Sequence, residues 1–243
     1  MAQKFDLVQE VSAGVEDRAA AWRFVRGFAR DWASPLTDGD GWSEEDLAAA
    51  EERLGVRLPV ALREAYLLLG RREDLTSNHD TLLSPAELYL DDRKEALVFR
   101  QENQGAASWG VLVADLGEAD PAVFVRMDLA DKRSEIWERW LDRLSLTFIE
   151  IVLSESVQAP GELTDFLGEL EEEDLETLER DCTRLPFPEY PLCQQPPGTR
   201  WFTGPGVLLR EDDRAVLYAR GRTPEALDEV RDQIAGDWLN DYR

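Results

Sequence analysis

The sequence predicts an α+β fold, and three observations indicate it. Apolar residues recur at helical spacing near the N-terminus and again between residues 43 and 70. Between residues 96 and 140 the pattern changes to short, β-branched or aromatic runs separated by turn residues. Helical spacing then returns from residue 141, and the hydrophobic share of 43% supports a folded core rather than disorder.

The first predicted helix covers residues 15 to 33. One apolar face carries Ala21, Phe24, Val25, Phe28 and Trp32, and Pro35 with the polar run after it ends the helix.

The second and third helices are bounded by residues that start and stop helices. Ser43 is the predicted N-cap of the second, with Asp46 three residues on in a weak capping box, and Gly55 ends it. Pro59 lies in the first turn of the third helix, which ends at Gly70. The predicted buried stripes are Leu47, Ala50 and Leu54 in the second helix and Leu62, Ala65, Tyr66 and Leu69 in the third.

Four strands are predicted in the middle of the chain, at 96–99, 109–114, 122–125 and 135–140. The strand at 109–114 is apolar on both faces, as expected of a central strand. The strand at 135–140, which contains Ile136, alternates like an outer strand. A helix follows over about 141 to 156, with a stripe of Leu144, Phe148, Ile151 and Val152.

A change of composition at Pro160-Gly161 marks a C-terminal extension. Residues 161 to 181 carry ten acidic residues and one basic residue, and their leucines follow a helical face. A proline-rich connector from 186 to 197 precedes two strands, 206–209 and 215–219, around the turn 211–213. Thr223 and Pro224 open a last helix, with Leu227, Val230, Ile234 and Trp238 facing inward. We therefore expect an N-terminal helix (1–33), an α+β domain (34–156) and an α-ββα extension (160–243).

The charge balance limits the partners. The chain has 51 acidic and 27 basic residues, a formal net charge of −24, so nucleic acid and anionic membranes would repel it. The same charge keeps a protein soluble and speeds its encounter with a basic partner. No apolar run approaches the length of a membrane span, the N-terminus lacks the pattern of a signal peptide, and Cys182 and Cys193 make no disulfide framework. These features predict a cytoplasmic protein.

No catalytic or metal-binding motif is present. The single histidine, His79, lies in a polar loop, and we interpret it as an exposed residue without a role. There is no Gly-x-Ser-x-Gly elbow, no P-loop and no Asp-rich calcium loop, and only three residues are His or Cys. We expect no catalytic residues, no cofactor and no metal.

One polar segment between strands is a candidate binding site. Glu102, Asn103 and Gln104 are followed by Trp109, and Asp120 precedes the next strand. A carboxylate, two amides and an indole could contact a partner or a small polar ligand. The alternative is structural: the polar residues would shape and satisfy the loop, and Trp109 would belong to the core.

Several motifs in one order resemble the SUKH superfamily, which includes fungal cell-wall-assembly regulators and bacterial toxin-immunity proteins. They are Gly41-Trp42-Ser43, Glu51-Glu52-Arg53-Leu54-Gly55, Leu58-Pro59, Leu82-Leu83-Ser84-Pro85, Glu102-Asn103-Gln104-Gly105, Trp109-Gly110, Asp120-Pro121-Ala122-Val123 and Leu144-Ser145-Leu146-Thr147-Phe148. The resemblance covers about residues 34 to 156. It implies a mixed or antiparallel central sheet packed by helices and a protein that acts by binding, without shared catalytic residues. Trp42 joins the candidate binding positions as an aromatic within these motifs.

Three functions remain open. The first is an immunity protein that inhibits a basic, nuclease-like toxin by occluding its surface, a role that the resemblance implies and the acidic charge fits. The second is a regulatory or scaffolding module with several partners. The third is a small-ligand binder that uses the segment from Glu102 to Trp109.

Overall fold

The chain opens with two helices where one was predicted. The computed structural model describes residues 5–191 and 198–239, and begins with α1 (Leu7–Glu16) and α2 (Arg18–Trp32). Asp17 separates them in an extended conformation, and its carboxylate accepts a hydrogen bond from the Ala20 backbone N–H at 2.7 Å. The helix predicted over 15–33 is therefore α2, which starts at this N-cap, but the expectation of one helix in residues 1–33 is wrong, because α1 packs Leu7 and Val11 into the core before it.

The helix pair forms as its boundary residues predict. In α3 (Glu44–Leu54) the Ser43 and Asp46 side chains and backbones make both hydrogen bonds of a capping box, and Gly55 ends the helix at a φ of 71°. Pro59 was predicted in the first turn of the third helix, but it is the N-cap of α4 (Val60–Leu69), just before that turn. The predicted face of α4 is buried. A short helix, α5 (Glu73–Thr76), follows.

The first sheet is antiparallel throughout, which agrees with the predicted fold class. Its strands are β1 (Thr81–Leu82), β2 (Tyr89–Leu90), β3 (Ala96–Gln101), β4 (Ala107–Leu112), β5 (Val123–Met127) and β6 (Glu138–Leu141). Their order is β1-β3-β4-β5-β6, with β2 also paired to β3, and the 3-10 helix η1 (Val113–Asp115) follows β4. The last strand starts three residues later than predicted, and Ile136 lies before it with 54% of its surface exposed.

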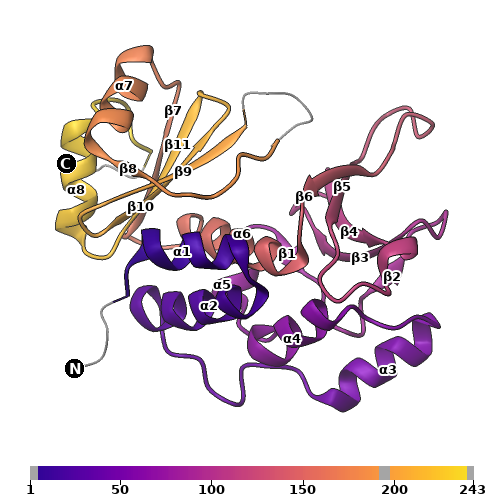
Figure 1. The fold of residues 1–243 in the computed structure, drawn as a ribbon. Coiled ribbons are helices and arrows are strands. Elements are labelled where there is room, and N and C mark those ends of the chain that lie inside the picture. Colours follow the sequence, from indigo (N-terminus) through magenta and orange to yellow (C-terminus); the bar gives the residue numbers. More distant parts are fainter. Residues whose placement is uncertain (1–4, 192–197, 240–243) are drawn as a thin grey trace.

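Helix α6 (Leu144–Val157) is the buried centre of the molecule. All of its residues are buried, although the sequence indicated only one apolar stripe. It contacts α2, α4 and α5 as well as strands of both sheets, so every face is covered (Figure 1). In such an environment a helix is buried on all sides and not along one stripe only.

The C-terminal extension contains the predicted helix, two strands and last helix, and three further strands complete a second antiparallel sheet. Its elements are β7 (Thr164–Gly168), α7 (Glu172–Asp181), β8 (Thr183–Arg184), β9 (Thr199–Gly204), β10 (Val207–Asp212), β11 (Val216–Gly221) and α8 (Pro224–Gln233). The strand order is β7-β11-β10-β9-β8. The first part of the predicted acidic helix is thus strand β7, because pairing with β11 satisfies its backbone groups.

The turn between β10 and β11 also lies later than predicted. Glu211 and Asp212 belong to β10, and Asp213 and Arg214 form the turn with φ values of 54° and 56°. Part of the predicted connector, together with Cys193, falls outside the described residues.

The second sheet has two different faces. Val207 and Leu209 of β10 pack with Leu227 and Val230 of α8 in a separate apolar cluster. Leu208, which alternates with them, belongs to the main core around α6. Helices α7 and α8 therefore cover one face of this sheet and α6 covers the other (Figure 1). Among the helices in the described part of the chain, none has the length and apolar character that a bilayer crossing requires.

Candidate functional site

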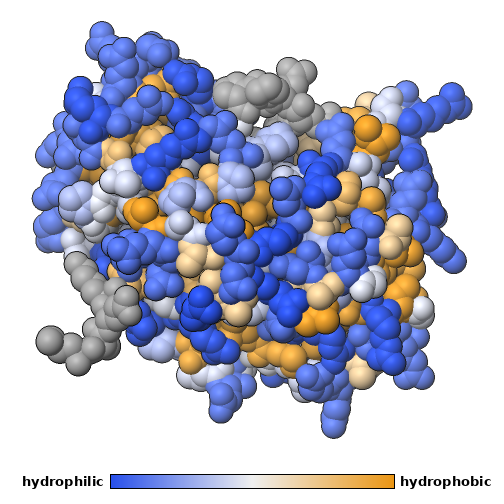
Figure 2. All heavy atoms as spheres, viewed as in Figure 1, coloured by the Kyte–Doolittle hydropathy of each residue, from blue (hydrophilic) through white to orange (hydrophobic). Residues whose placement is uncertain are grey.

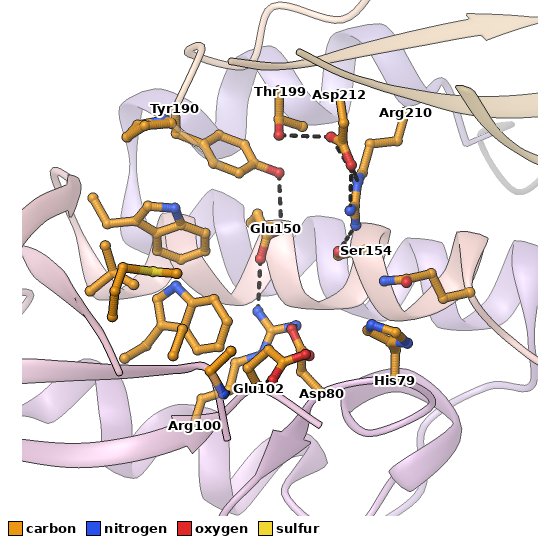
Figure 3. A pocket seen from close by; sticks show the side chains of 18 of the residues that line it. His79, Asp80, Arg100, Glu102, Glu150, Ser154, Tyr190, Thr199, Arg210 and Asp212 are labelled. Atoms are coloured by element: carbon orange, nitrogen blue, oxygen red, sulfur yellow. Dashed lines mark hydrogen bonds and ion pairs between the residues drawn. The ribbon is translucent and has the colours of Figure 1, made fainter. Parts of the chain in front are cut away.

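A cavity of about 300 Å³ lies where the two sheets meet beside α6 (Figure 3). Strands of the first sheet supply a largely apolar wall, and α6 lies along it. Chain segments of the second sheet and its connector close the other side. The aromatic lining residues are Trp109, Trp140, Tyr190 and Tyr218, and the charged ones are Asp80, Arg100, Glu102, Glu150, Arg210 and Asp212.

A buried arginine organises the first-sheet side of the cavity. Arg100, at 1% exposed, donates from Nη1 to Glu150 at 3.0 Å and from Nη2 to Glu155 at 2.6 Å, and Nη2 lies 3.3 Å from Asp80. Burial disfavours the charged guanidinium, but the three carboxylates outweigh that cost and raise the pKa of Arg100. Burial also raises the pKa of Glu150, against the opposing effect of Arg100.

A second arginine closes the cavity from the other sheet. Arg210 donates to Asp212 at 2.6 and 2.9 Å and also to the hydroxyl of Ser154 on α6. The hydroxyl of Tyr190 donates to Glu150 at 2.9 Å. Glu150 therefore joins the first sheet, through Arg100, to the segment between β8 and β9 of the second sheet, through Tyr190 (Figure 3).

Three potential metal ligands lie together at the exposed end of the cavity. The ligand atoms of His79, Asp80 and Glu102 all lie within 4.8 Å of one another. Glu155 positions the loop that carries the first two, because its carboxylate accepts the backbone N–H groups of His79 at 2.6 Å and Asp80 at 3.3 Å. Burial, together with repulsion from Glu155, raises the pKa of Asp80.

The predicted binding segment contributes to this cavity only in part. Glu102 and Trp109 line it, whereas Asn103 and Gln104 are exposed in the turn between β3 and β4. Glu102 also accepts the backbone N–H groups of Gln104 at 2.8 Å and Ala106 at 2.9 Å, as the structural alternative proposed. The amide nitrogen of Asn103 lies 3.2 and 3.3 Å from the two ring nitrogens of His79.

Trp42 and Asp120 lie outside the cavity and have structural contacts. The indole N–H of Trp42 donates to the Gly70 carbonyl at 2.9 Å, and the guanidinium of Arg71 stacks 4.4 Å from its ring centre. Asp120 accepts the backbone N–H of Ser145 at 2.8 Å and its hydroxyl at 2.6 Å. It thereby satisfies a free donor in the first turn of α6.

Most of the charged residues of the cavity were not predicted from the sequence. Their signal was a charge inside an apolar run: Arg100 follows Ala96-Leu97-Val98-Phe99, Glu150 interrupts the apolar residues of α6, and Arg210 ends Val207-Leu208-Leu209. Charged residues are rarely buried without a partner, so each of these positions indicated a buried ion pair.

A capped helix pair, an antiparallel sheet and a closing helix define the class of this protein as α+β with a SUKH-like arrangement. Residues 41–151 match the family model described as SMI1 / KNR4 family (SUKH-1). This match, which runs from just before α3 into α6 and covers less than half of the chain, supports membership of the segment in the SUKH superfamily. No curated protein and no solved structure matches the chain. Membership is consistent with a role as an immunity protein or a regulator.

Proposed function

We propose that the protein is a cytoplasmic immunity protein that acts without catalysis, by binding a basic, nuclease-like toxin and occluding its surface. The observation that carries the proposal is the net charge of −24 on a chain with a SUKH segment. A nuclease must attract phosphate, so its substrate cleft is positively charged, and an acidic inhibitor is steered to the same place.

The exposed side of α7 and α8 is the surface that best fits such a partner. The two helices carry ten acidic and two basic residues. Their apolar residues, Leu178 on α7 and Leu227 and Val230 on α8, share one cluster, so the polar sides of both helices face solvent. The surface over α7, at the upper left of Figure 2, is largely hydrophilic.

The first test is capture of partners from a lysate of the native host, washed at low and at high salt, followed by co-expression. We expect one basic protein that is released at high salt, whose toxicity to cells is suppressed when this chain is co-expressed. Several unrelated partners without protection would favour the regulatory or scaffolding alternative and would contradict the immunity proposal.

Charge variants locate the surface once the partner is known. Glu173→Gln, Glu176→Gln and Glu229→Gln together remove three exposed carboxylates from α7 and α8. The matched control removes three exposed carboxylates elsewhere, with Glu16→Gln, Asp38→Asn and Glu118→Gln. We expect the first triple variant to lower the association rate more than the control at low salt. Equal effects would show that net charge matters and this surface does not.

Small-ligand binding is the second candidate, and the cavity favours it. Its volume of about 300 Å³ and its aromatic lining are typical of small-molecule sites. The Nε of Arg100 and the indole N–H of Trp109 are buried donors without an acceptor in the described part of the chain. Native mass spectrometry of the purified protein tests this candidate, because a retained molecule adds a defined mass that Trp109→Ala should remove.

A further inference from the structure

The cluster of His79, Asp80 and Glu102 has the composition and spacing of a metal site. One ring nitrogen and two carboxylate oxygens lie within 4.8 Å of one another. In a tetrahedral zinc site with bonds of about 2.0–2.1 Å, ligand atoms lie about 3.3 Å apart. His79 is exposed and Glu102 is half-buried, so side-chain movements on the order of 1 Å close the remaining distance.

The residues behind these three are arranged as supporting contacts. Arg100 lies 3.3 Å from one oxygen of Asp80, and the other oxygen accepts the backbone N–H of Asn103 at 3.3 Å. Glu155 fixes the backbone of both His79 and Asp80. Metal-binding carboxylates are commonly oriented by hydrogen bonds of this kind, which keep the ligands in position before the ion arrives.

The surrounding charge favours a cation. Five carboxylates lie around the cavity, on Asp80, Glu102, Glu150, Glu155 and Asp212, against two guanidinium groups. Arg210 is engaged by Asp212, which leaves Arg100 to balance several carboxylates on the side of His79. A divalent ion beside Asp80 would compensate this excess.

We propose that His79, Asp80 and Glu102 bind one divalent transition-metal ion of the zinc class at the exposed end of the cavity. The imidazole selects this class over Mg²⁺ and Ca²⁺, which prefer oxygen ligands alone. All three residues line the cavity, so the open side of the bound ion faces its interior. No spacing in the sequence indicates this site, because Glu102 lies 23 positions after His79 and only the fold brings the two together.

The single histidine of the chain makes the test direct, because every imidazole signal belongs to His79. Zn²⁺ is titrated into the ¹⁵N-labelled protein, with binding followed by calorimetry and the ring nitrogens by long-range ¹H–¹⁵N correlation spectra. We expect one high-affinity ion per chain, a shift of one ring nitrogen on binding, and no displacement by a tenfold excess of Mg²⁺. His79→Ala and Glu102→Gln should each weaken binding at least tenfold.

Glu52→Gln on α3 is the matched control, since it removes an exposed carboxylate from another part of the surface. It should leave Zn²⁺ affinity unchanged. Zn²⁺ binding that leaves the His79 ring signals unmoved, or that persists at full affinity in His79→Ala, would overturn the proposal and indicate non-specific binding to an acidic surface. No detectable Zn²⁺ binding would also overturn it. The test uses no protein partner, so its outcome is independent of the immunity proposal.

Discussion

Replacing Arg100 with Met should destabilise the protein strongly and in a pH-dependent way. The substitution keeps an apolar stem of similar length but leaves Asp80, Glu150 and Glu155 without the guanidinium that they contact at 2.6 to 3.3 Å. Removing one partner of a buried ion pair costs about 3–5 kcal/mol, because the remaining charge stays buried without compensation. We expect a loss of this size in the free energy of unfolding at pH 7.5, measured by urea denaturation.

The loss should shrink as the pH falls. Burial already raises the pKa of Asp80 and Glu150 in the folded protein, and removal of the cation raises these values further. A carboxyl group whose pKa is higher in the folded state stabilises the fold below its unfolded value, near 4, and that contribution is lost as the pH rises through the folded value. The deficit of Arg100→Met should therefore be smaller at pH 5 than at pH 7.5.

An ion pair with an exposed guanidinium is the control for this prediction. Arg57 is 89% exposed and contacts Glu51 at 2.9 Å, so Arg57→Met should cost less than about 1 kcal/mol at both pH values. An Arg100→Met variant that loses no more than this control, or loses equally at both pH values, would refute the reasoning about buried charge.

Two further predictions concern packing and reactivity. Gly41→Ala should lower the free energy of unfolding by about 1–3 kcal/mol, because the new Cβ would overlap the Leu67 carbonyl oxygen. Gly117→Ala, with no neighbour within 4 Å, should change it little, and equal urea midpoints would contradict this. Burial, with a smaller effect of Asp181, raises the pKa of Cys182 to about 11. In a Cys193→Ser background its reaction with Ellman's reagent at pH 8 should therefore be about a hundredfold slower in the folded protein than in urea, and equal rates would contradict the burial.

Local hydrogen bonding explains which elements the sequence predicted well. The capping boxes and caps at Ser43, Gly55 and Thr223 depend on residues within a few positions, so a sequence pattern contains all the information they need. Asp17 is also a local N-cap, but it was not recognised as the start of α2, and α1 before it was not predicted.

Tertiary pairing explains what the sequence did not predict. Residues 164–168 suit a helix or a strand, and only the neighbouring β11 makes them a strand. The cavity is a stronger case, because His79, Arg100, Glu150 and Arg210 come from both sheets, α6 and a loop. Their spacing in the sequence does not indicate that these four residues meet. They meet because the second sheet docks on α6. The charged residues inside apolar runs indicated that a buried polar site exists, but not where it lies in the fold.

The buried charges on α6 also bear on how the two sheets are held. A buried ion pair is weak evidence for stability, since an apolar replacement of both partners is often neutral. It does oppose alternative arrangements, because a shifted second sheet would remove the hydrogen bond from Tyr190 to Glu150 and the one from Arg210 to Ser154, and would leave these buried polar groups less well satisfied. We therefore interpret the contacts of Glu150 with Arg100 and Tyr190, and of Arg210 with Ser154, as fixing the position of the second sheet against the SUKH segment. On this interpretation the acidic helices α7 and α8 meet a partner as a rigid surface, and Glu155 holds the backbone of His79 and Asp80 in place before any ion binds.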